Sequence, residues 1–364
     1  MKLSTTTSTT SASTDRIVID EKKEKHLKSL SKEEAVNINY MSLTPLYLSE
    51  VSEELEFVNY NTLSGLRVDK GMERLLSKMQ FLNDHVVKEK TLVIYIGYAS
   101  NLYVNALFEL YPDMYWYLVD PVTPPNMYYL PNVTVVNGYF NDELVKDLGI
   151  LFTITNTKRV LLLSDLRTCL EEKNFKDSVV LDSIIEKDME DQKRWTTELS
   201  RSLSCGKSLY ALLRFGVPKL EPQTLEYFSG SLYVPIYGKL DIRDYYLRVE
   251  NIYTTKVYDI QSINRKGMYF TKNVRCAYYA YNYVKEQNID HCFDCAARFD
   301  VFTKYVETTG RYSVALIKML LLKYIDTSKP SVHHHISSKN SQQLLEYSQE
   351  RMRALIGPLS HYTL

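Results

Sequence analysis

The sequence lacks any long hydrophobic run. No stretch of about eighteen apolar residues, the length that a membrane-spanning helix needs, occurs among its 364 residues. The N-terminus also lacks the apolar core of a secretory signal. We therefore expect a soluble, cytoplasmic protein without a membrane partner.

An excess of charge of either sign is also missing. Forty-four basic residues balance forty-four acidic ones, so no overall field draws the protein toward nucleic acid or an anionic surface. Any RNA site must then be a local patch.

Cysteine is scarce. The five cysteines are an odd number, which is typical of reduced thiols in a reducing compartment. Cys292 and Cys295 follow His291 at a spacing that zinc ligands use, but no second pair follows. We expect the pair to pack on a helix facing the core. The run from His333 to His335 is expected to be solvated, so no metal site is predicted.

Apolar runs and helical patterns alternate through the middle of the chain. Apolar residues at helical spacing predict a helix over 69–82, and further helices are expected at 102–110 and 187–203. Continuous apolar runs predict buried strands at 91–97, 115–121, 133–136, 159–165 and 209–215, with later strands at 230–237 and 245–249. This alternation indicates an α/β fold with a mostly parallel sheet and helices on both faces.

The two ends of the chain differ from this centre. Residues 1–40 are rich in Ser, Thr, Lys and Glu, which predicts a disordered tail. The α/β domain is expected to cover 41–260. A helical extension over 261–327, with helices at 273–284, 292–306 and 312–324, should pack on it. A polar loop and a helix at 342–355 should occupy 328–364.

Ligands of such sheets bind outside the carboxyl ends of the strands. Asp120, at the end of the second strand, is placed to take the ribose hydroxyls of a nucleoside. The other candidates at strand ends are Gly97, Ala99, Tyr139, Phe140 and Asp165. Each feature alone is weak, because acids and glycines are also ordinary turn residues.

Taken in order, these strand-end segments resemble those of a known family. The series LVIYIGYA (92–99), YLVDP (117–121), LLLSDLRT (161–168) and ALLRFGVP (211–218) is similar to that of the cap-specific mRNA 2′-O-methyltransferases of poxviruses and other large DNA viruses. The helix GMERLLSKMQFL (71–82) looks like the family's Gly-Gln-Leu-Lys-Leu-Leu helix. The resemblance covers about residues 48–306.

The resemblance carries expectations about fold, cofactor and partners. It implies a Rossmann-like fold that uses S-adenosyl-L-methionine, and RNA, capped or single-stranded, as a ligand. In this family the same polypeptide is also the regulatory subunit of the viral poly(A) polymerase. It therefore implies a poly(A) polymerase catalytic subunit as a partner, in the host cytoplasm or the virion.

The family's mechanism implies four catalytic groups: a lysine in the early helix, the aspartate of Ser-Asp-Ile/Val-Arg, a lysine ending the fifth strand, and a later glutamate. The resemblance places Arg74, Asp165, Arg214 and Asp244 at these positions. An arginine stays protonated at any working pH. Arg214 therefore cannot be the base that deprotonates a ribose 2′-hydroxyl.

The cofactor and cap sub-sites also depart from the family's pattern. Its Gly-x-Ala-Pro-Gly loop is Gly-Tyr-Ala-Ser-Asn at 97–101 here. Its aromatic cap slot would have Phe57 on one side and Lys219 on the other. We expect a groove with phosphate-binding cations and stacking aromatic rings, lined by Arg167, Arg214, Lys219, Arg243, Tyr98 and Phe215.

Three functions remain open from the sequence. The first is an RNA-binding regulatory subunit that has lost methyl transfer. The second is an active cap 2′-O-methyltransferase in which Lys219 or another nearby amine replaces the missing lysine. The third is a structural or assembly protein that reuses the fold.

Overall fold

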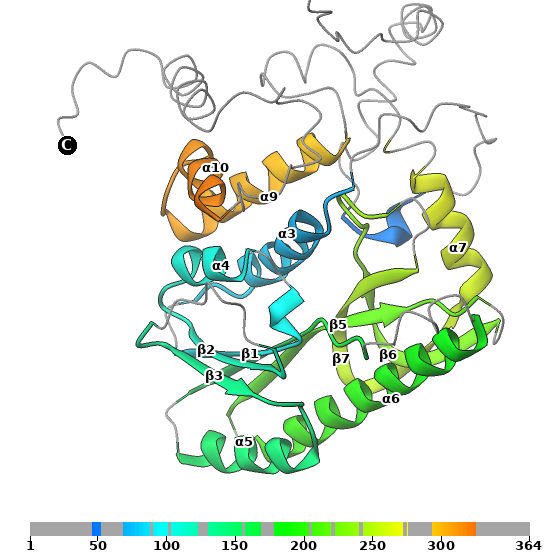
Figure 1. Cartoon of the computed structure of the whole chain (residues 1–364), viewed down its shortest axis with the longest axis horizontal. Coiled ribbons are helices and arrows are strands. Elements are labelled where there is room, and N and C mark those ends of the chain that lie inside the picture. Colours follow the sequence, from blue (N-terminus) through cyan, green and yellow to red (C-terminus); the bar gives the residue numbers. More distant parts are fainter. Residues whose placement is uncertain are drawn as a thin grey trace, which may run out of the picture.

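The computed structural model describes residues 46–51, 68–87, 90–100, 103–122, 130–154, 157–168, 178–203, 206–219, 223–239, 243–271, 275 and 293–324. Figure 1 shows these residues as coloured ribbon. The expected N-terminal tail, the helix at 273–284 and the segment 328–364 lie outside them.

Seven strands form one mixed, largely parallel sheet. The strands are β1 (Thr91–Ile96), β2 (Tyr115–Asp120), β3 (Val133–Asn137), β4 (Arg159–Ser164), β5 (Ser208–Gly216), β6 (Thr224–Leu232) and β7 (Asp244–Asp259), in the order β3-β2-β1-β4-β5-β7-β6. Strands β1 to β5 are parallel. Strand β7 runs antiparallel to both β5 and β6. The predicted α/β class with a mostly parallel sheet is confirmed.

The last two strands differ from their predicted bounds. The strand expected at 230–237 instead begins at Thr224 and ends at Leu232, and the one expected at 245–249 continues to Asp259. The pairing of β6 with β7 is irregular around Ser229, so period-two alternation is interrupted. Gly230 lies so close to β7 that a Cβ there would come within 2.3 Å of the Arg248 carbonyl oxygen.

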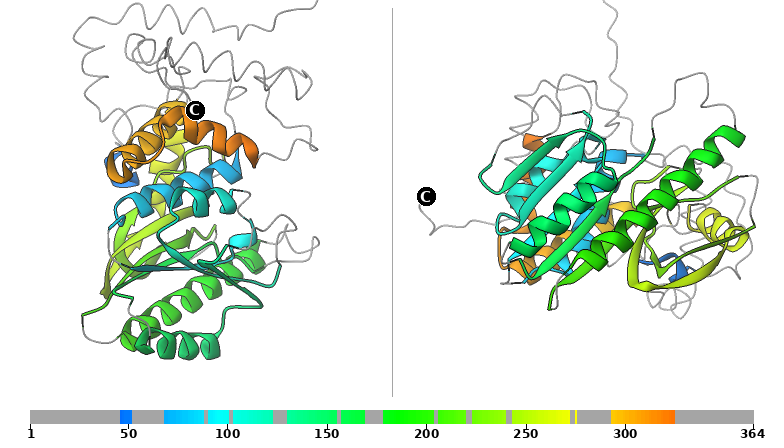
Figure 2. Two further views of the ribbon diagram at one scale, coloured as in Figure 1. Left: turned by 90° about the vertical axis from the view of Figure 1, so that its left-hand side faces the viewer. Right: turned by 90° about the horizontal axis from the view of Figure 1, so that it is seen from below.

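Helices cover both faces of the sheet, as predicted. Helices α3 (Lys70–Asn83) and α4 (Val104–Leu110) lie on one face, and α5 (Asp142–Ile154) and α6 (Ser178–Ser202) lie on the other (Figures 1 and 2). Helix α5 was not predicted, and α6 starts well before the expected residue 187. Helix α7 (Ile260–Tyr269) follows β7 directly, where the helical pattern was expected to begin.

The C-terminal helices pack mainly on α3 and not directly on the sheet. Helix α9 (Phe293–Thr309) crosses α3, and α10 (Val314–Lys323) packs on α9, so both lie beyond α3 and α4 (Figure 1). The Asn83 side-chain amide donates to the Val301 carbonyl at 3.2 Å. The hydroxyl of Tyr305 donates to the Leu110 carbonyl at 2.6 Å. These helices therefore fix the outer side of α3.

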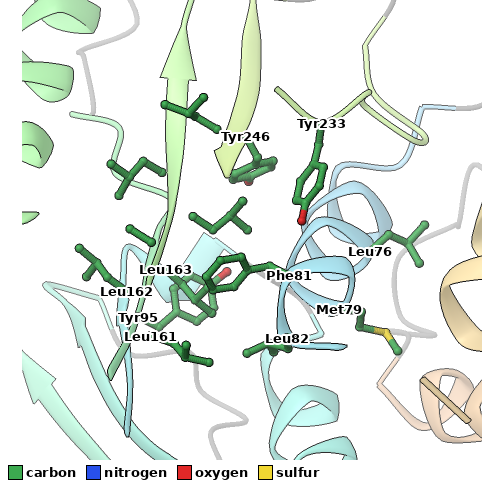
Figure 3. Close-up of a cluster of buried hydrophobic side chains, with 14 of the residues drawn as sticks. Leu76, Met79, Phe81, Leu82, Tyr95, Leu161, Leu162, Leu163, Tyr233 and Tyr246 are labelled. Atoms are coloured by element: carbon green, nitrogen blue, oxygen red, sulfur yellow. The ribbon is translucent and has the colours of Figure 1, made fainter. Parts of the chain in front are cut away.

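The core is one cluster of buried apolar side chains on both faces of the sheet, beneath α3 and α4 on one side and α5 and α6 on the other. Figure 3 shows part of it, with Phe81 and Leu82 of α3 near Leu161 of β4, and with the rings of Tyr95 and Tyr246 in the same interior. All six residues of β1 are buried, as its unbroken apolar run predicted. No helix in the described part of the chain is long and apolar enough to cross a membrane.

Candidate functional site

The strand order reverses direction between β1 and β4, and this position is where open α/β sheets place their ligands. Gly97 ends β1 with a φ of 73°, and a Cβ there would lie 3.0 Å from the Asp165 carbonyl carbon. Only glycine tolerates both that backbone conformation and that contact. The turn therefore holds the end of β1 tightly against Asp165, directly after β4.

Asp165 lies in a fully buried polar cluster, the Asp165 cluster, which consists of Lys78, Tyr95, Asp165 and Tyr246. The Lys78 ammonium and the Tyr246 hydroxyl both donate to Oδ1. The Tyr95 hydroxyl donates to Oδ2 at 2.5 Å. The Lys78 Nζ also lies 3.6 Å from the centroid of the Tyr246 ring. Three donors inside the fold thus hold the carboxylate that the sequence identified.

Lys78 is the residue that the sequence reasoning missed. Arg74 was placed at the position of the early lysine, but Lys78, one turn further along α3, forms the ion pair with Asp165. The two side chains share one helix face because they are four residues apart. The missed signal is a lysine inside the apolar stripe of α3, since a buried lysine needs an acidic partner.

A second group at the strand ends, the Asp244 bridge, consists of Arg167, Arg214 and Asp244. The Arg214 Nη2 donates to Asp244 Oδ2 at 2.7 Å, and the Arg167 Nη2 donates to Oδ1. On the other side of the strand, the Gln192 side chain bonds both the N–H and the carbonyl of Arg214, at 3.2 and 3.1 Å. Asp244, predicted to replace the family's glutamate, therefore pairs with both arginines predicted to face RNA.

The protonation states of these groups follow from their neighbours. Burial alone would raise the pKa of Asp165, but the charges of Lys78 and Arg74 outweigh it and lower that pKa. Burial lowers the pKa of Lys78 to about 8, against the opposing effect of Asp165. Burial would also lower the pKa of Arg214, but Asp244 and Tyr246 raise it well above its usual value. Arg214 is thus a permanent cation.

Glu73, in the first turn of α3, differs from its charged neighbours. Burial and the nearby Asp244 raise its pKa to about 7, although Arg74 and Arg214 act in the opposite direction. Its carboxylate accepts no hydrogen bond from the residues that the structure describes. Glu73 can therefore gain or lose a proton at neutral pH. Its sequence context, between Met72 and Arg74, gave no sign of this.

The residues predicted to bind the nucleoside lie at the ends of β2 and β3. The Asp120 carboxylate accepts from the backbone N–H groups of Ala99 and Val122, at 3.2 and 2.9 Å. Burial raises the pKa of Asp120, against the effect of these two bonds. Tyr139 is 78% exposed, whereas Phe140 is buried against Trp195 with ring centroids 5.0 Å apart. Phe140 is thus a core residue here.

The predicted RNA face is only partly present. Tyr98 and Phe215 are fully buried, so the prediction that bases stack on them is wrong. Lys219 is exposed, and its backbone N–H donates to Asp182 at 2.8 Å. The Arg243 guanidinium has two buried nitrogens without a hydrogen-bond partner among the described residues. Phe57 lies outside those residues.

The structure describes no group of three or more His, Cys, Asp or Glu side chains that could hold a metal ion. His291, Cys292 and the histidines at 333–335 lie outside the described residues, as does the Cys295 side chain. The predictions about them stay predictions.

In a comparison with protein-family models, residues 40–189 match the family described as the Poly A polymerase regulatory subunit. No curated protein sequence matches the chain.

Among solved structures, VP4 of bluetongue virus, described as a multifunctional RNA-capping protein, is similar at 17% identity and a TM-score of 0.37. That match covers 56% of this chain and 31% of VP4, so the chain spans about a third of its length. A short chain dehydrogenase from Leptospira borgpetersenii, with NAD⁺ bound, is 12% identical at a TM-score of 0.24, covering 32% and 48% of the two chains.

Proposed function

We propose that this protein is an RNA-binding regulatory subunit whose methyl-transfer site is degenerate, because residues 40–189 match the poly(A) polymerase regulatory subunit family. The family name implies a poly(A) polymerase catalytic subunit as its partner. Its place of action would be the host cytoplasm or the virion.

The observation that carries this proposal is the internal pairing of the polar groups at the strand ends. Arg214, at the position of the family's base, is a cation bound to Asp244. The buried Asp165 carboxylate accepts hydrogen bonds from Lys78 and two tyrosine hydroxyls. A general base must be unprotonated and within reach of the proton that it removes. Neither Arg214 nor the buried Lys78 meets both conditions at neutral pH.

S-adenosylmethionine, if it binds, would supply the methyl group. Asp120 fits the nucleoside half of that cofactor, because a carboxylate has about four acceptor positions and two bonds from backbone N–H groups leave others for ribose hydroxyls. Asp120→Ala should therefore weaken binding of S-adenosylhomocysteine in calorimetry. Equal affinity of the two proteins would contradict a role for Asp120.

A direct assay tests the loss of methyl transfer. Purified protein is incubated with capped RNA and methyl-labelled S-adenosylmethionine, and we expect no more product than from Asp120→Ala. Robust transfer that Asp120→Ala abolishes would overturn the proposal. If the site is only latent, Arg214→Lys should raise the signal above the wild-type level.

A second function, methyl transfer by a rearranged site, has one observation in its favour. Glu73 has a pKa of about 7, which suits a general base. If the protein transfers methyl groups, Glu73→Gln should abolish transfer while S-adenosylhomocysteine still binds. Transfer that is unchanged by Glu73→Gln would exclude Glu73 as the base.

RNA binding has its own test. Lys219 and Arg243 are the cations of the predicted groove without an ion pair among the described residues. We compare Lys219→Gln/Arg243→Gln with Lys146→Gln/Lys187→Gln, which removes the same charge from exposed sites on α5 and α6. Fluorescence anisotropy with short uridine-rich RNA should show affinity that falls with salt, and a larger loss for the first variant. No binding at low salt would refute the regulatory-subunit proposal and favour a structural role.

A further inference from the structure

The segment that follows β6 has an unusual backbone. Tyr237 has a φ of 59°, in the left-handed region that residues other than glycine seldom adopt. Its side chain is buried, and its backbone N–H donates to the Asp294 carboxylate of α9 at 2.9 Å. Such conformations persist only where the surroundings hold them, and they concentrate at ligand-binding sites.

A buried ion pair holds this segment in place. Arg275 and Asp294 pair at 2.8 Å, with side chains 0% and 5% exposed. The Arg275 Nη1 also donates to the Gly238 carbonyl at 2.9 Å. The Asp294 carboxylate thus binds both Arg275 and the Tyr237 backbone. The segment is fixed from the side of α9 and is not an adaptable loop.

The other side of the segment lies against the start of α3. The Asp69 backbone N–H donates to the Tyr237 carbonyl at 2.9 Å. A Cβ at Gly238 would come within 3.1 Å of the Glu73 Oε1. These contacts bring the next residue, Lys239, beside Lys70, and both lysine side chains are exposed.

Like charges therefore gather at this point. Arg74 and Arg214 lie close enough to Lys70 that they act, together with burial and Lys239, to lower its pKa. Neither Lys70 nor Lys239 forms an ion pair with a carboxylate in the part of the chain that the structure describes. Asp69, the nearest acid in sequence, caps α3 by accepting from the Met72 N–H at 3.0 Å. Neighbouring ammonium groups repel each other, and an anion bound between them would remove that repulsion.

We propose that Lys70 and Lys239 form a binding site for a phosphate group. Their two ammonium groups offer donors and no acceptor, which suits phosphate oxygens. The phosphate would come either from the backbone of a bound RNA or from a polyphosphate, such as a nucleotide or an RNA 5′ end. The first source rests on the proposed function, whereas phosphate binding itself does not.

Tripolyphosphate is the first probe, measured by calorimetry and by thermal shift on the full chain. The variant is Lys70→Gln/Lys239→Gln, and the control of equal charge is again Lys146→Gln/Lys187→Gln. Both changed lysines are exposed, so each variant should fold, which circular dichroism checks. We expect at least a tenfold loss of affinity for the first variant and less than twofold for the control. Equal loss in both variants would overturn the proposal.

Two RNA probes separate the sources. Uridine 12-mers with a 5′-hydroxyl or a 5′-triphosphate are titrated by anisotropy at several salt concentrations. If the site holds a backbone phosphate, Lys70→Gln/Lys239→Gln weakens the binding of both RNAs. It also lowers the slope of log affinity against log salt concentration by about 1. If the site holds a terminal polyphosphate, the variant weakens the binding of the 5′-triphosphate RNA alone. Tripolyphosphate binding without any RNA binding would support the phosphate site and refute the proposed function.

Chemical footprinting gives an independent readout. Acetylation of Lys70 and Lys239, followed by mass spectrometry, should slow several-fold when tripolyphosphate is present, whereas acetylation of Lys146 should not change. Unprotected Lys70 and Lys239 under saturating tripolyphosphate would place the bound anion elsewhere and contradict the proposal.

Discussion

Glu73→Gln is expected to stabilise the protein at pH 8 and to have little effect at pH 5. The glutamine amide resembles the neutral carboxyl that the folded state favours at this position. Because the pKa of Glu73 is raised from 4.5 to about 7 by burial and Asp244, the folded state holds the proton more tightly than the unfolded chain. Its contribution to stability is therefore full below about pH 4.5 and is lost as the pH rises through 7.

The size of the effect follows from the two pKa values. The interval from 4.5 to about 7 corresponds to about 3 kcal/mol, at about 1.36 kcal/mol per pH unit. Glu73 is partly exposed, and solvent screening reduces such terms, so we expect about 1–3 kcal/mol of stabilisation at pH 8. The difference between variant and wild type should grow from pH 5 to about pH 7 and level off toward pH 8.

Urea unfolding of both proteins at half-unit pH steps measures this difference. Glu190→Gln serves as the control, because Glu190 is an exposed carboxylate on the outer side of α6. The control should show no such trend between pH 5 and pH 8. A Glu73→Gln difference that is flat with pH, or that becomes destabilising as the pH rises, would refute the burial of a proton-binding carboxyl here.

Three further changes test the contacts around the site. Asp165→Asn should cost about 3–5 kcal/mol in urea unfolding, because it leaves Lys78 buried without its counter-charge; a loss under 1 kcal/mol would show that the pair is solvated. Gln192→Leu should cost about 1–3 kcal/mol, because two backbone groups of Arg214 lose their partner. Asp294→Ala should reduce tripolyphosphate affinity as strongly as Lys70→Gln/Lys239→Gln does, and unchanged affinity would show that the Tyr237 segment needs no support.

The first five strands were predictable because burial on both faces requires continuous apolar runs. Leu92 to Ile96 is such a run, and every residue in it is buried. The strand that begins at Thr224 was not found, because its inner and outer faces differ and irregular pairing near Ser229 disturbs the alternation.

The sequence identified those site residues whose place in the fold follows directly from their position in the chain. Asp165 and Asp120 were found because each directly follows an apolar strand. Lys78 was missed, because its role depends on a contact with Asp165 across the fold. Arg214 was placed in the RNA groove, but residue types alone could not show that its charge is paired with Asp244. Charge balance within a site is a property of the packing.

The position of α3 between the sheet and α9 has a consequence for synthesis on the ribosome. Strands β1 to β7 are complete once residue 259 has been made, but the acid that holds Tyr237 and Arg275 is residue 294. The contacts on the outer side of α3 can also form only after α9 has been made. The nascent chain can thus form its sheet while the Lys70–Lys239 region is still open, and that region closes only after α9 leaves the exit tunnel.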